Sequence, residues 1–293
     1  MNKHAYLIMA HNNPKVLDVL LQMIDDERND IFLHVDKNSD LLQRHKFSTH
    51  RARLCFTDEF LKISWGGYSQ IACEMLLFRT ARAHGPYAYY HLISGSDLPL
   101  KSQDYIHAFC QQHQGAEFIG FVPMDDKERR SARKRVGRYW ALQPWFRTNN
   151  VLKKALRNAT NLLLRMLPRR MDMDFQKGCN WVSLTEECVD YLLQNAPLIQ
   201  QRFSHCYLAD ENYKQTLVYT NPTLRSHIFD PGNEAHSCLR EIDWTRGKPY
   251  TWTIADHEQL SNSDALFARK FSDEQFEIVE WVKQHVGLPG DKE

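Results

Sequence analysis

The chain has 293 residues, long enough for one large α/β domain or two small ones around a sizeable core. Its hydrophobic content of 43% and charged content of 25% are those of a soluble globular protein and exclude a disordered chain. The net charge is only +1, but residues 127–170 hold 14 basic residues and one acidic residue. Such a segment predicts an anionic partner (phosphate, nucleic acid or an anionic membrane surface), unless it is a solvated face that the acidic remainder of the chain balances.

The cysteines and the amino terminus indicate a cellular compartment. The seven cysteines are scattered and include no C-x-x-C pair, as in proteins of a reducing cytoplasm. The apolar run before His11 spans about six residues, too short for a signal peptide or a membrane-spanning helix. We therefore expect the protein to be made and used in the cytoplasm.

Strands and helices alternate along the first 125 residues. Short apolar runs predict strands at 4–11, 30–36, 52–58, 87–94 and 116–122. Helical spacing predicts helices from Pro14, after the Gly66-Gly67 turn with Ser69 as the cap, and after a cap at Ser102. The alternation predicts an α/β fold with a doubly wound, mostly parallel sheet flanked by helices, whose ligands bind at the carboxyl ends of the strands.

Residues 127–170 interrupt this alternation. Within them, "NVLKKALRNATNLLLRMLP" places apolar side chains on one helical face and Lys153, Lys154 and Arg157 largely on the other. We expect this basic amphipathic helix to pack on its own domain, and the alternative is a helix that lies on a membrane. The final third mixes short strands with helices, so one domain with a basic helical insertion is the simplest organisation.

Several chemistries lack their signatures. The sequence contains no G-x-x-x-x-G-K-[ST] phosphate loop, no G-x-G-x-x-G and no G-x-S-x-G elbow. A sheet with carboxylates at its strand ends and no phosphate loop leaves nucleotide-sugar transfer as a candidate, and such transferases commonly hold a divalent ion on an Asp-x-Asp pair. No such pair falls at a strand end here, so we expect lysine and arginine to neutralise a leaving diphosphate.

The candidate cations occur in two short motifs. Arg246 and Lys248 lie in "TRGKP", and Arg269 and Lys270 lie in "FARKF". The alternative interpretation for each is an ordinary surface charge. Both interpretations stay open on the motifs alone.

Transfer with inversion at the sugar also needs a general base within reach of the acceptor hydroxyl. Asp210 and Glu211 in "LADENYKQT" fall at a loop-to-helix junction, where an acidic residue is equally natural as a helix-start charge. Trp65, beside Gly66, and Trp181 offer aromatic faces on which an acceptor sugar could stack, and core packing is the alternative for each.

Taken together, these motifs resemble the family of core 2/I-branching β-1,6-N-acetylglucosaminyltransferases and peptide O-xylosyltransferases. The resemblance rests on "AYLIMAHNNPKVLDVLLQMI", "FLHVDKNSD", "SWGGYSQIACEMLLFRTA", "YYHLISGSDLPLKS", "GCNWVSLT", "ADENYKQTLVYTNP", "LREIDW" and "LFARKF", which follow the family's order. It covers most of the chain but not the basic segment. It implies a GT-A-like fold, an inverting mechanism, a UDP-sugar donor and no metal cofactor.

The resemblance also divides the single domain, 1–293, into three parts. Residues 1–125 form the nucleotide-binding half, 126–172 the basic helical insertion, and 173–293 the acceptor-binding and catalytic half. Glu211 falls on the family's catalytic base, and Lys270 on the lysine that neutralises the donor diphosphate. Arg246 or Lys248 is the expected partner of that lysine, and the spacing does not decide between them.

The remaining donor-binding residues are expected at the carboxyl ends of the strands. His34 and Asp36 fall on the family loop that contacts the nucleotide, and His11 ends the first strand. Asp97 stands where other GT-A enzymes keep a metal-binding motif. It is expected to hold donor hydroxyls or to fix the turn that shapes the pocket. Asn180 stands where xylosyltransferases have an aspartate, so the role of that carboxylate is not carried over.

The expected function is therefore transfer of N-acetylglucosamine, in β-1,6 linkage, from a UDP-sugar to a glycan or glycolipid acceptor. The absence of a stem and an anchor suggests a bacterial enzyme of surface polysaccharide or lipopolysaccharide synthesis, on the inner face of the cell membrane. Xylosyl or other hexosyl transfer is one alternative. A binding module without turnover is another, including a nucleic-acid binder that uses "RYWALQPWFR", although nucleic acid is not the expected partner.

Overall fold

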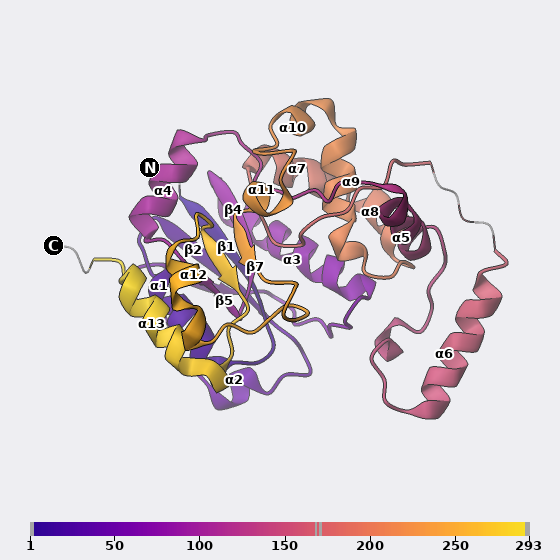
Figure 1. Ribbon diagram of the computed structural model, residues 1–293, viewed down its shortest axis with the longest axis horizontal. Coiled ribbons are helices and arrows are strands. Elements are labelled where there is room, and N and C mark those ends of the chain that lie inside the picture. The colour runs from indigo at the N-terminus through magenta and orange to yellow at the C-terminus, as the bar shows by residue number, and fades with distance from the viewer. Residues whose placement is uncertain (1–2, 168, 170–171, 291–293) are drawn as a thin grey trace.

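The computed structural model of the protein describes residues 3–167, 169 and 172–290 (Figure 1). Arg170, one of the basic residues of the middle segment, lies outside the described residues. The elements of the first part are β1 (His4–Ala10), α1 (Pro14–Met23), β2 (Asn29–Val35), α2 (Leu41–Arg44), β3 (Arg53–Phe56), α3 (Tyr68–His84), β4 (Tyr89–Ser94), β5 (Asp97–Pro99) and α4 (Gln103–Gln112). The insertion contributes α5 (Asp126–Val136), η1 (Gln143–Trp145) and α6 (Val151–Leu164).

The last part of the chain is mainly helical. Its elements are β6 (Val182–Leu184), α7 (Glu186–Gln194), α8 (Ala196–Phe203), η2 (Ala209–Glu211), α9 (Tyr213–Thr220), α10 (Pro222–Ser226), α11 (Glu234–Cys238), β7 (Arg240–Ile242), η3 (Ile254–Asp256), α12 (His257–Ser261), β8 (Phe267–Arg269), η4 (Asp273–Gln275) and α13 (Phe276–Val286). None of the helices in the described ranges combines the length and the apolar character needed to cross a bilayer.

A five-stranded sheet with the order β3-β2-β1-β4-β6 forms the centre of the molecule. β3, β2, β1 and β4 are parallel, and β6 runs antiparallel to β4. A smaller sheet has the order β5-β8-β7, with β5 antiparallel and β7 parallel to β8. The predicted α/β class, with a mostly parallel sheet flanked by helices, is confirmed.

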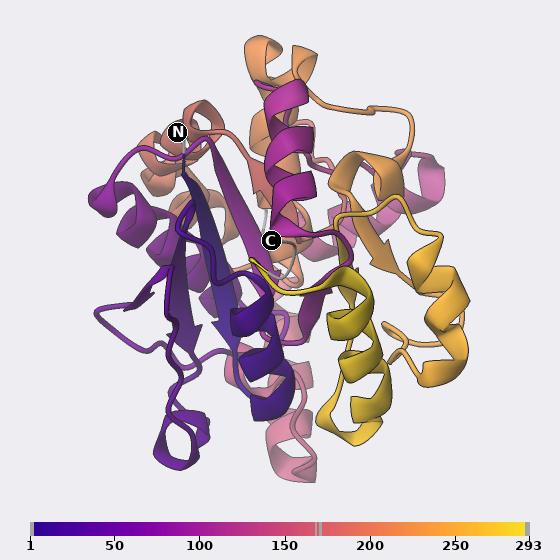
Figure 2. The same ribbon diagram turned by 90° about the vertical axis from the view of Figure 1, so that its left-hand side faces the viewer.

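Both faces of the main sheet are covered at β1, β2 and β4, which explains why the residues of these strands are mostly apolar and almost all buried. Along β1, Tyr6 and Ile8 belong to the core that includes α1 and α13, whereas Ala5 and Leu7 belong to the core that includes α3, α7 and α8. Figures 1 and 2 show α1 and α13 side by side on one face of the sheet and α3 on the other. The charged strand ends therefore stand at the edge of a double-sided core.

The expected strand at 116–122 is wrong, although the structure describes all of these residues. In place of a regular strand, Glu117 forms an isolated parallel bridge with Ile228, and Phe118 an antiparallel bridge with Ser183. The segment passes the edge strand β6 and leaves it after one pairing. Its large apolar side chains are nevertheless buried, so the apolar pattern in the sequence predicted burial correctly but not strand pairing.

The expected helix caps have mixed outcomes. Ser102 caps α4, because its hydroxyl accepts the Tyr105 amide at 3.3 Å. The cap of α3 is Gly67, and not Ser69 as expected. The Ser69 hydroxyl instead accepts the Ser64 amide at 2.8 Å, so it fixes the turn before the helix.

α6 departs most from expectation. The helix forms where its periodicity predicts it, but its apolar face is exposed, with Leu152 81% and Leu163 68% accessible. Figure 1 shows α6 at the right-hand side, away from the helices that cover the sheet. The expectation that this helix packs on its own domain through its apolar face is therefore wrong.

The bridge at Glu117 leads to a prediction about stability and pH. Burial raises the pKa of Glu117 from 4.5 to about 7, although its carboxylate accepts the Thr185 amide at 3.0 Å and the Thr185 hydroxyl. A carboxyl with a raised pKa in the folded state contributes stability below its unfolded pKa and loses it as the pH rises through the folded pKa. Between pH 5 and 8 we expect this group to lower the free energy of unfolding by about 2 to 3 kcal/mol.

Glu117→Gln removes the titration and keeps the shape. We would therefore measure the free energy of unfolding in urea at pH 5 and pH 8. The difference between the variant and the wild type should shift in favour of the variant by about 2 to 3 kcal/mol from pH 5 to pH 8. A stability difference between the two proteins that is the same at both pH values would contradict the prediction.

Candidate active site

The pairing of β5 with β8 joins two of the motifs. Its register sets Asp97 opposite Arg269, and the Arg269 guanidinium nitrogen Nη1 lies 3.5 Å from Asp97 Oδ1. The Asp97 carboxylate is 1% exposed and accepts the Ser94 amide at 2.9 Å and the Ser94 hydroxyl at 2.8 Å. Of the two roles expected for Asp97, these contacts fit the second, because the carboxylate fixes the turn and pairs with Arg269.

Arg269 and Lys270 have side chains with unused hydrogen-bonding capacity. The Arg269 guanidinium lies 4.2 Å from the centre of the Trp181 ring, and its Nε and Nη1 are buried without a hydrogen-bond partner in the described part of the chain. Lys270 is fixed only by its backbone, which donates to the Tyr250 carbonyl at 3.3 Å and accepts from the Trp252 amide at 3.0 Å. Its ammonium group forms no hydrogen bond or ion pair with any described residue, so it is available to an anion.

His11 lies beside this basic pair. Partial burial lowers the pKa of His11, Asp36 raises it, and the nearby charges of Arg269 and Lys270 lower it. The end of β1 is thus within electrostatic reach of both Asp36 and the end of β8. The structure brings these three predicted donor-site segments together at the carboxyl ends of the strands.

His34 and Asp36 are committed to the loop that follows β3. His34 is 1% exposed, and its ring nitrogen Nε2 accepts the Leu61 amide at 2.8 Å. Asp36 accepts the Ile63 amide at 3.1 Å and the Asn38 amide at 2.7 Å. The expectation of direct nucleotide contact is corrected for His34, whose buried ring shapes the loop, whereas Asp36 remains partly exposed.

The contacts of Arg246 and Lys248 differ, and the difference bears on which of the two could contact a diphosphate. Arg246 donates to Asp243 and to Asp256, each at 2.5 Å, and its guanidinium lies 4.1 Å from the Tyr250 ring. Lys248 is exposed and forms no ion pair with a described residue. Arg246 therefore holds its own loop together, and Lys248 is the one of the two that is open to an anion.

Glu211 ends the short helix η2, and its side chain is 29% exposed. Its oxygen Oε2 forms a short ion pair with Arg135 of the insertion helix α5, and no described residue hydrogen-bonds its Oε1. The backbone carbonyl of Glu211 accepts the Gly178 amide at 3.0 Å. Arg135 thus holds one carboxylate oxygen and Gly178 holds the backbone of Glu211, while the other carboxylate oxygen stays open.

Asp210 is buried and plays a different part. Burial and the neighbouring charges of Glu211 and Glu74 raise the pKa of Asp210 and Lys214 lowers it, with a net pKa of about 7. Gln70 donates to Asp210 Oδ2 at 3.2 Å and also accepts the Gly66 amide. Asp210 therefore braces the loop that carries Glu211, and the expected contact with an acceptor does not fit its burial.

The Trp65-Gly66 turn lies directly against this loop. Gly66 has a φ of 70°, and a side chain there would come within 3.1 Å of Leu208 and Tyr207. Its carbonyl accepts the Leu208 amide at 2.9 Å. Trp65 is 39% exposed, but the Arg147 guanidinium lies 3.6 Å from its ring centre. The faces of Trp65 and Trp181 expected to stack on sugar thus each carry an arginine already.

Three functional contributions were missed by sequence reasoning: those of Arg135, Gln70 and Lys214. Lys214 is fully buried, where its ammonium pairs with Glu74 and donates to Asn180 Oδ1 at 2.6 Å. Asn180 precedes Trp181, so this contact connects the Glu211 loop with the surface under Arg269. The segment 178–181 therefore joins the acidic and the basic parts of the site.

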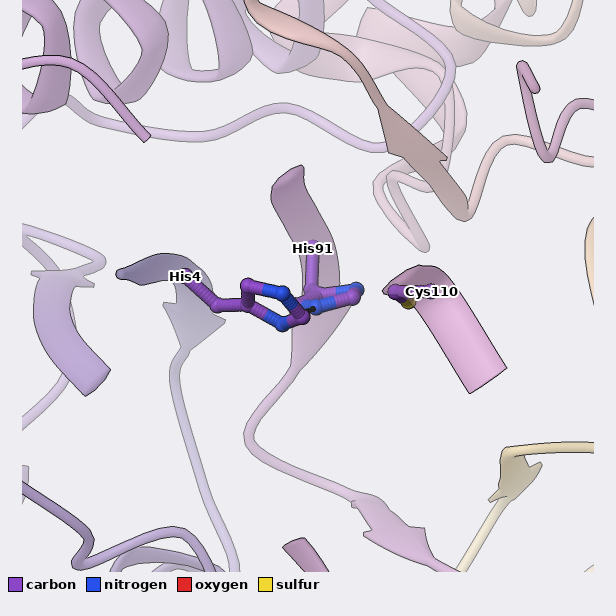
Figure 3. A group of neighbouring side chains, drawn as sticks. All are labelled: His4, His91 and Cys110. Carbon is purple, nitrogen blue, oxygen red and sulfur yellow. Dashed lines mark hydrogen bonds between the residues drawn. The ribbon is translucent and has the colours of Figure 1, made fainter. Parts of the chain in front are cut away.

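A group of possible metal ligands lies elsewhere, at the amino ends of the strands (Figure 3). His91 Nε2 is 3.0 Å from His4 Nδ1, and His91 Nδ1 is 2.7 Å from the Ser183 hydroxyl, with Cys110 nearby. Burial lowers the pKa of both histidines well below the ordinary value, and the buried charge of Arg240 lowers that of His91 further. A cation bound there would lie near a buried guanidinium, so we interpret the group as core packing.

The arrangement defines an α/β protein: a mostly parallel sheet whose strand ends carry a basic pair beside an acidic loop. The sequence model of the Core-2/I-Branching enzyme family matches residues 4–265. The chain therefore belongs to the core-2/I-branching enzyme family, and the resemblance seen in the motifs is confirmed.

The similar curated proteins are xylosyltransferases. Xylosyltransferase 2 of Rattus norvegicus is 21% identical over 303 residues, covering 96% of this chain and 33% of that protein. Xylosyltransferase 1 of Homo sapiens is 20% identical over 287 residues, covering 91% and 28%. The chain thus spans about a third of the length of these relatives. Among solved structures, apo mouse xyloside xylosyltransferase 1 aligns over 92% of this chain and 97% of its own, with 11% identity and a TM-score of 0.36.

Proposed function

We propose that this protein is an inverting glycosyltransferase that moves a sugar from a UDP-sugar to a glycan or glycolipid acceptor. One observation carries the proposal: the ends of β1, β5 and β8 gather His11, Arg269 and Lys270 into one cluster, in which Arg269 Nε and the Lys270 ammonium have no hydrogen-bond partner among the described residues. Such a cluster suits a nucleoside diphosphate, because charge-assisted hydrogen bonds to phosphate oxygens are strong in a partly buried site.

The proposed reaction assigns separate tasks to the two parts of the site. Glu211 takes the proton from the acceptor hydroxyl as its oxygen attacks the anomeric carbon on the face opposite UDP. Lys270, with Lys248 as its proposed partner, stabilises the negative charge that develops on the departing diphosphate. Arg269 orients the same group from the floor of the site, where Asp97 and Trp181 hold it.

Two donor sugars are compatible with the proposal, N-acetylglucosamine and xylose. The family resemblance in the motifs favours N-acetylglucosamine transferred in β-1,6 linkage, whereas the names of the curated relatives favour xylose. A panel of UDP-sugars, including UDP-N-acetylglucosamine and UDP-xylose, decides between them through the rate of UDP release with and without acceptors. Binding of none of these donors would contradict the proposed function as a whole.

We also propose that the reaction needs no divalent metal. Asp97, at the position of the usual metal motif, has its carboxylate engaged by Ser94 and Arg269, and Lys270 and Lys248 can carry the neutralising charge. Transfer rates measured with EDTA are therefore expected to stay within about twofold of those without it. A requirement for manganese or magnesium would overturn the lysine and arginine mechanism.

The acceptor and the location are proposed together. We place the protein on the cytoplasmic side of the cell membrane, peripherally bound, where bacterial surface polysaccharide or lipopolysaccharide is assembled. The strongly basic composition of residues 127–170 supports this location, because the cytoplasmic leaflet carries negative charge.

A further inference from the structure

The helix α6 exposes an unusual concentration of apolar side chains. Outside α6 and the two residues after its last turn, large exposed apolar side chains in the described part of the chain are few and scattered. On this one segment, seven of them occur: Val151, Leu152, Leu156, Leu162, Leu163, Met166 and Leu167. Monomeric soluble proteins rarely leave such a contiguous apolar surface without a partner.

The orientation of α6 is the reverse of an ordinary surface helix. Arg157 turns toward the protein and donates to the carbonyls of Trp145 and Phe146, each at 2.8 Å. Asn161, 8% exposed, accepts the Ala141 amide at 2.8 Å through its side chain. A polar face therefore attaches α6 to the protein, and the apolar face points outward.

Charge surrounds the apolar face. With 3.6 residues per turn, Lys154 and Arg165 lie along one border of this face, and both are exposed. Long basic side chains at such a border can extend to lipid phosphates while the apolar residues enter the interface. At 14 residues the helix is too short to cross a bilayer, so it would lie in the plane of the surface.

We infer that α6 is a docking surface for an anionic lipid bilayer, with the apolar residues of 151–167 inserted at the interface. Residues 127–170, with 14 basic residues and one acidic residue, are repelled by a second copy of themselves but attracted to anionic lipid. Nucleic acid would not cover the exposed leucines with an apolar surface. The Arg157 guanidinium is also unavailable for phosphate, because it donates to carbonyls of the protein. This inference rests on the membrane location proposed above and not on sugar transfer.

The docking surface is joined to the site by direct contacts. Arg147, in the link between η1 and α6, covers the Trp65 ring, and the adjoining Gly66 contacts the loop of Glu211 through Leu208. The acceptor side of the site is therefore connected to the helix that meets the lipid. This continuity favours a lipid-linked acceptor over a free glycan.

The test is co-sedimentation of the full chain with vesicles of phosphatidylcholine and phosphatidylglycerol, with pure phosphatidylcholine vesicles as the comparison. We expect binding to the anionic vesicles only. The triple variant Leu152→Ser, Leu156→Ser and Leu163→Ser should bind them about tenfold more weakly, as should Lys154→Glu with Arg165→Glu. The fold is not at risk, because all five side chains are exposed. Tyr105→Ser, which removes a 47% exposed aromatic from α4, is the matched control and should bind like the wild type.

Two outcomes would overturn the inference. One is vesicle binding by the triple leucine variant that equals that of the wild type, or no binding by either protein. The other is a wild-type dimer, measured by light scattering, that the triple variant converts to a monomer, because the apolar face would then bind a second copy. UDP release by the same variants separates this question from the proposed function, since vesicle binding can fail while transfer persists.

Discussion

Glu211→Gln is expected to lower the rate of sugar transfer by a factor of about 10² to 10⁴, the usual contribution of a positioned general base. The amide has the size and shape of the carboxylate but cannot take the proton from the acceptor. The structure leaves Glu211 Oε1 open to such a proton while Arg135 holds Oε2. Transfer rates with the preferred donor, measured at saturating acceptor, check the expectation.

Glu186→Gln is the matched control for this variant. Glu186 is 32% exposed and lies 3.4 Å from Arg82, so it resembles Glu211 in exposure and in its arginine partner but lies on α7. The control should transfer sugar like the wild type, and both variants should bind UDP with unchanged affinity. If Glu211→Gln also turned over at the wild-type rate, the base would have to be another group.

Lys270→Ala is expected to lower the turnover number by about 10² to 10³-fold, the range seen when one group that stabilises developing charge is removed. UDP binding should weaken less than turnover, because the negative charge on the diphosphate grows as the bond to the sugar breaks. The folded state should be little affected, since Lys270 is held by its backbone and its ammonium bonds to no described residue. Steady-state rates and UDP titrations measure the two effects separately.

Lys283→Ala serves as the control for Lys270→Ala. Lys283 is a partly buried lysine on α13, away from the ends of β1, β5 and β8, and its removal should change neither turnover nor UDP affinity. Lys270→Arg should recover part of the turnover, because it restores a cation at the same position. Equal loss of turnover and of thermal stability in Lys270→Ala would instead indicate a structural role.

The parts of the fold predicted best are those whose local pattern has one physical explanation. β1, β2 and β4 are mostly apolar because helices cover both faces of the sheet, and this pattern can be seen in the sequence. The segment 116–122 shows the same apolar pattern. Such a pattern predicts that the side chains are buried, but it does not predict that the segment pairs with another strand. For α6, periodicity predicts which side chains share a face, and it cannot predict whether protein, lipid or water covers that face.

The site was predicted as far as strand ends and short motifs allow. His11 follows from the rule that ligands bind at the carboxyl ends of parallel strands, whereas Arg269 and Lys270 come from the motif "FARKF" and the family resemblance. Arg135 and Lys214 were missed, because their partners lie 76 and 140 residues away along the chain. A buried lysine is also atypical, and nothing in "DENYKQT" distinguishes Lys214 from a surface residue.

The pairing of β5 with β8 has a consequence for how the molecule acquires its activity during synthesis. Asp97 leaves the ribosome long before Arg269, and contacts between residues so far apart in sequence form late because the loop between them must first close. The five-stranded sheet can pair β1, β2, β3 and β4 from the first third of the chain alone. The proposed donor site needs Arg269 and Lys270, which are synthesised after all strands of that sheet, so a nascent or truncated chain can pair those strands and still lack this site.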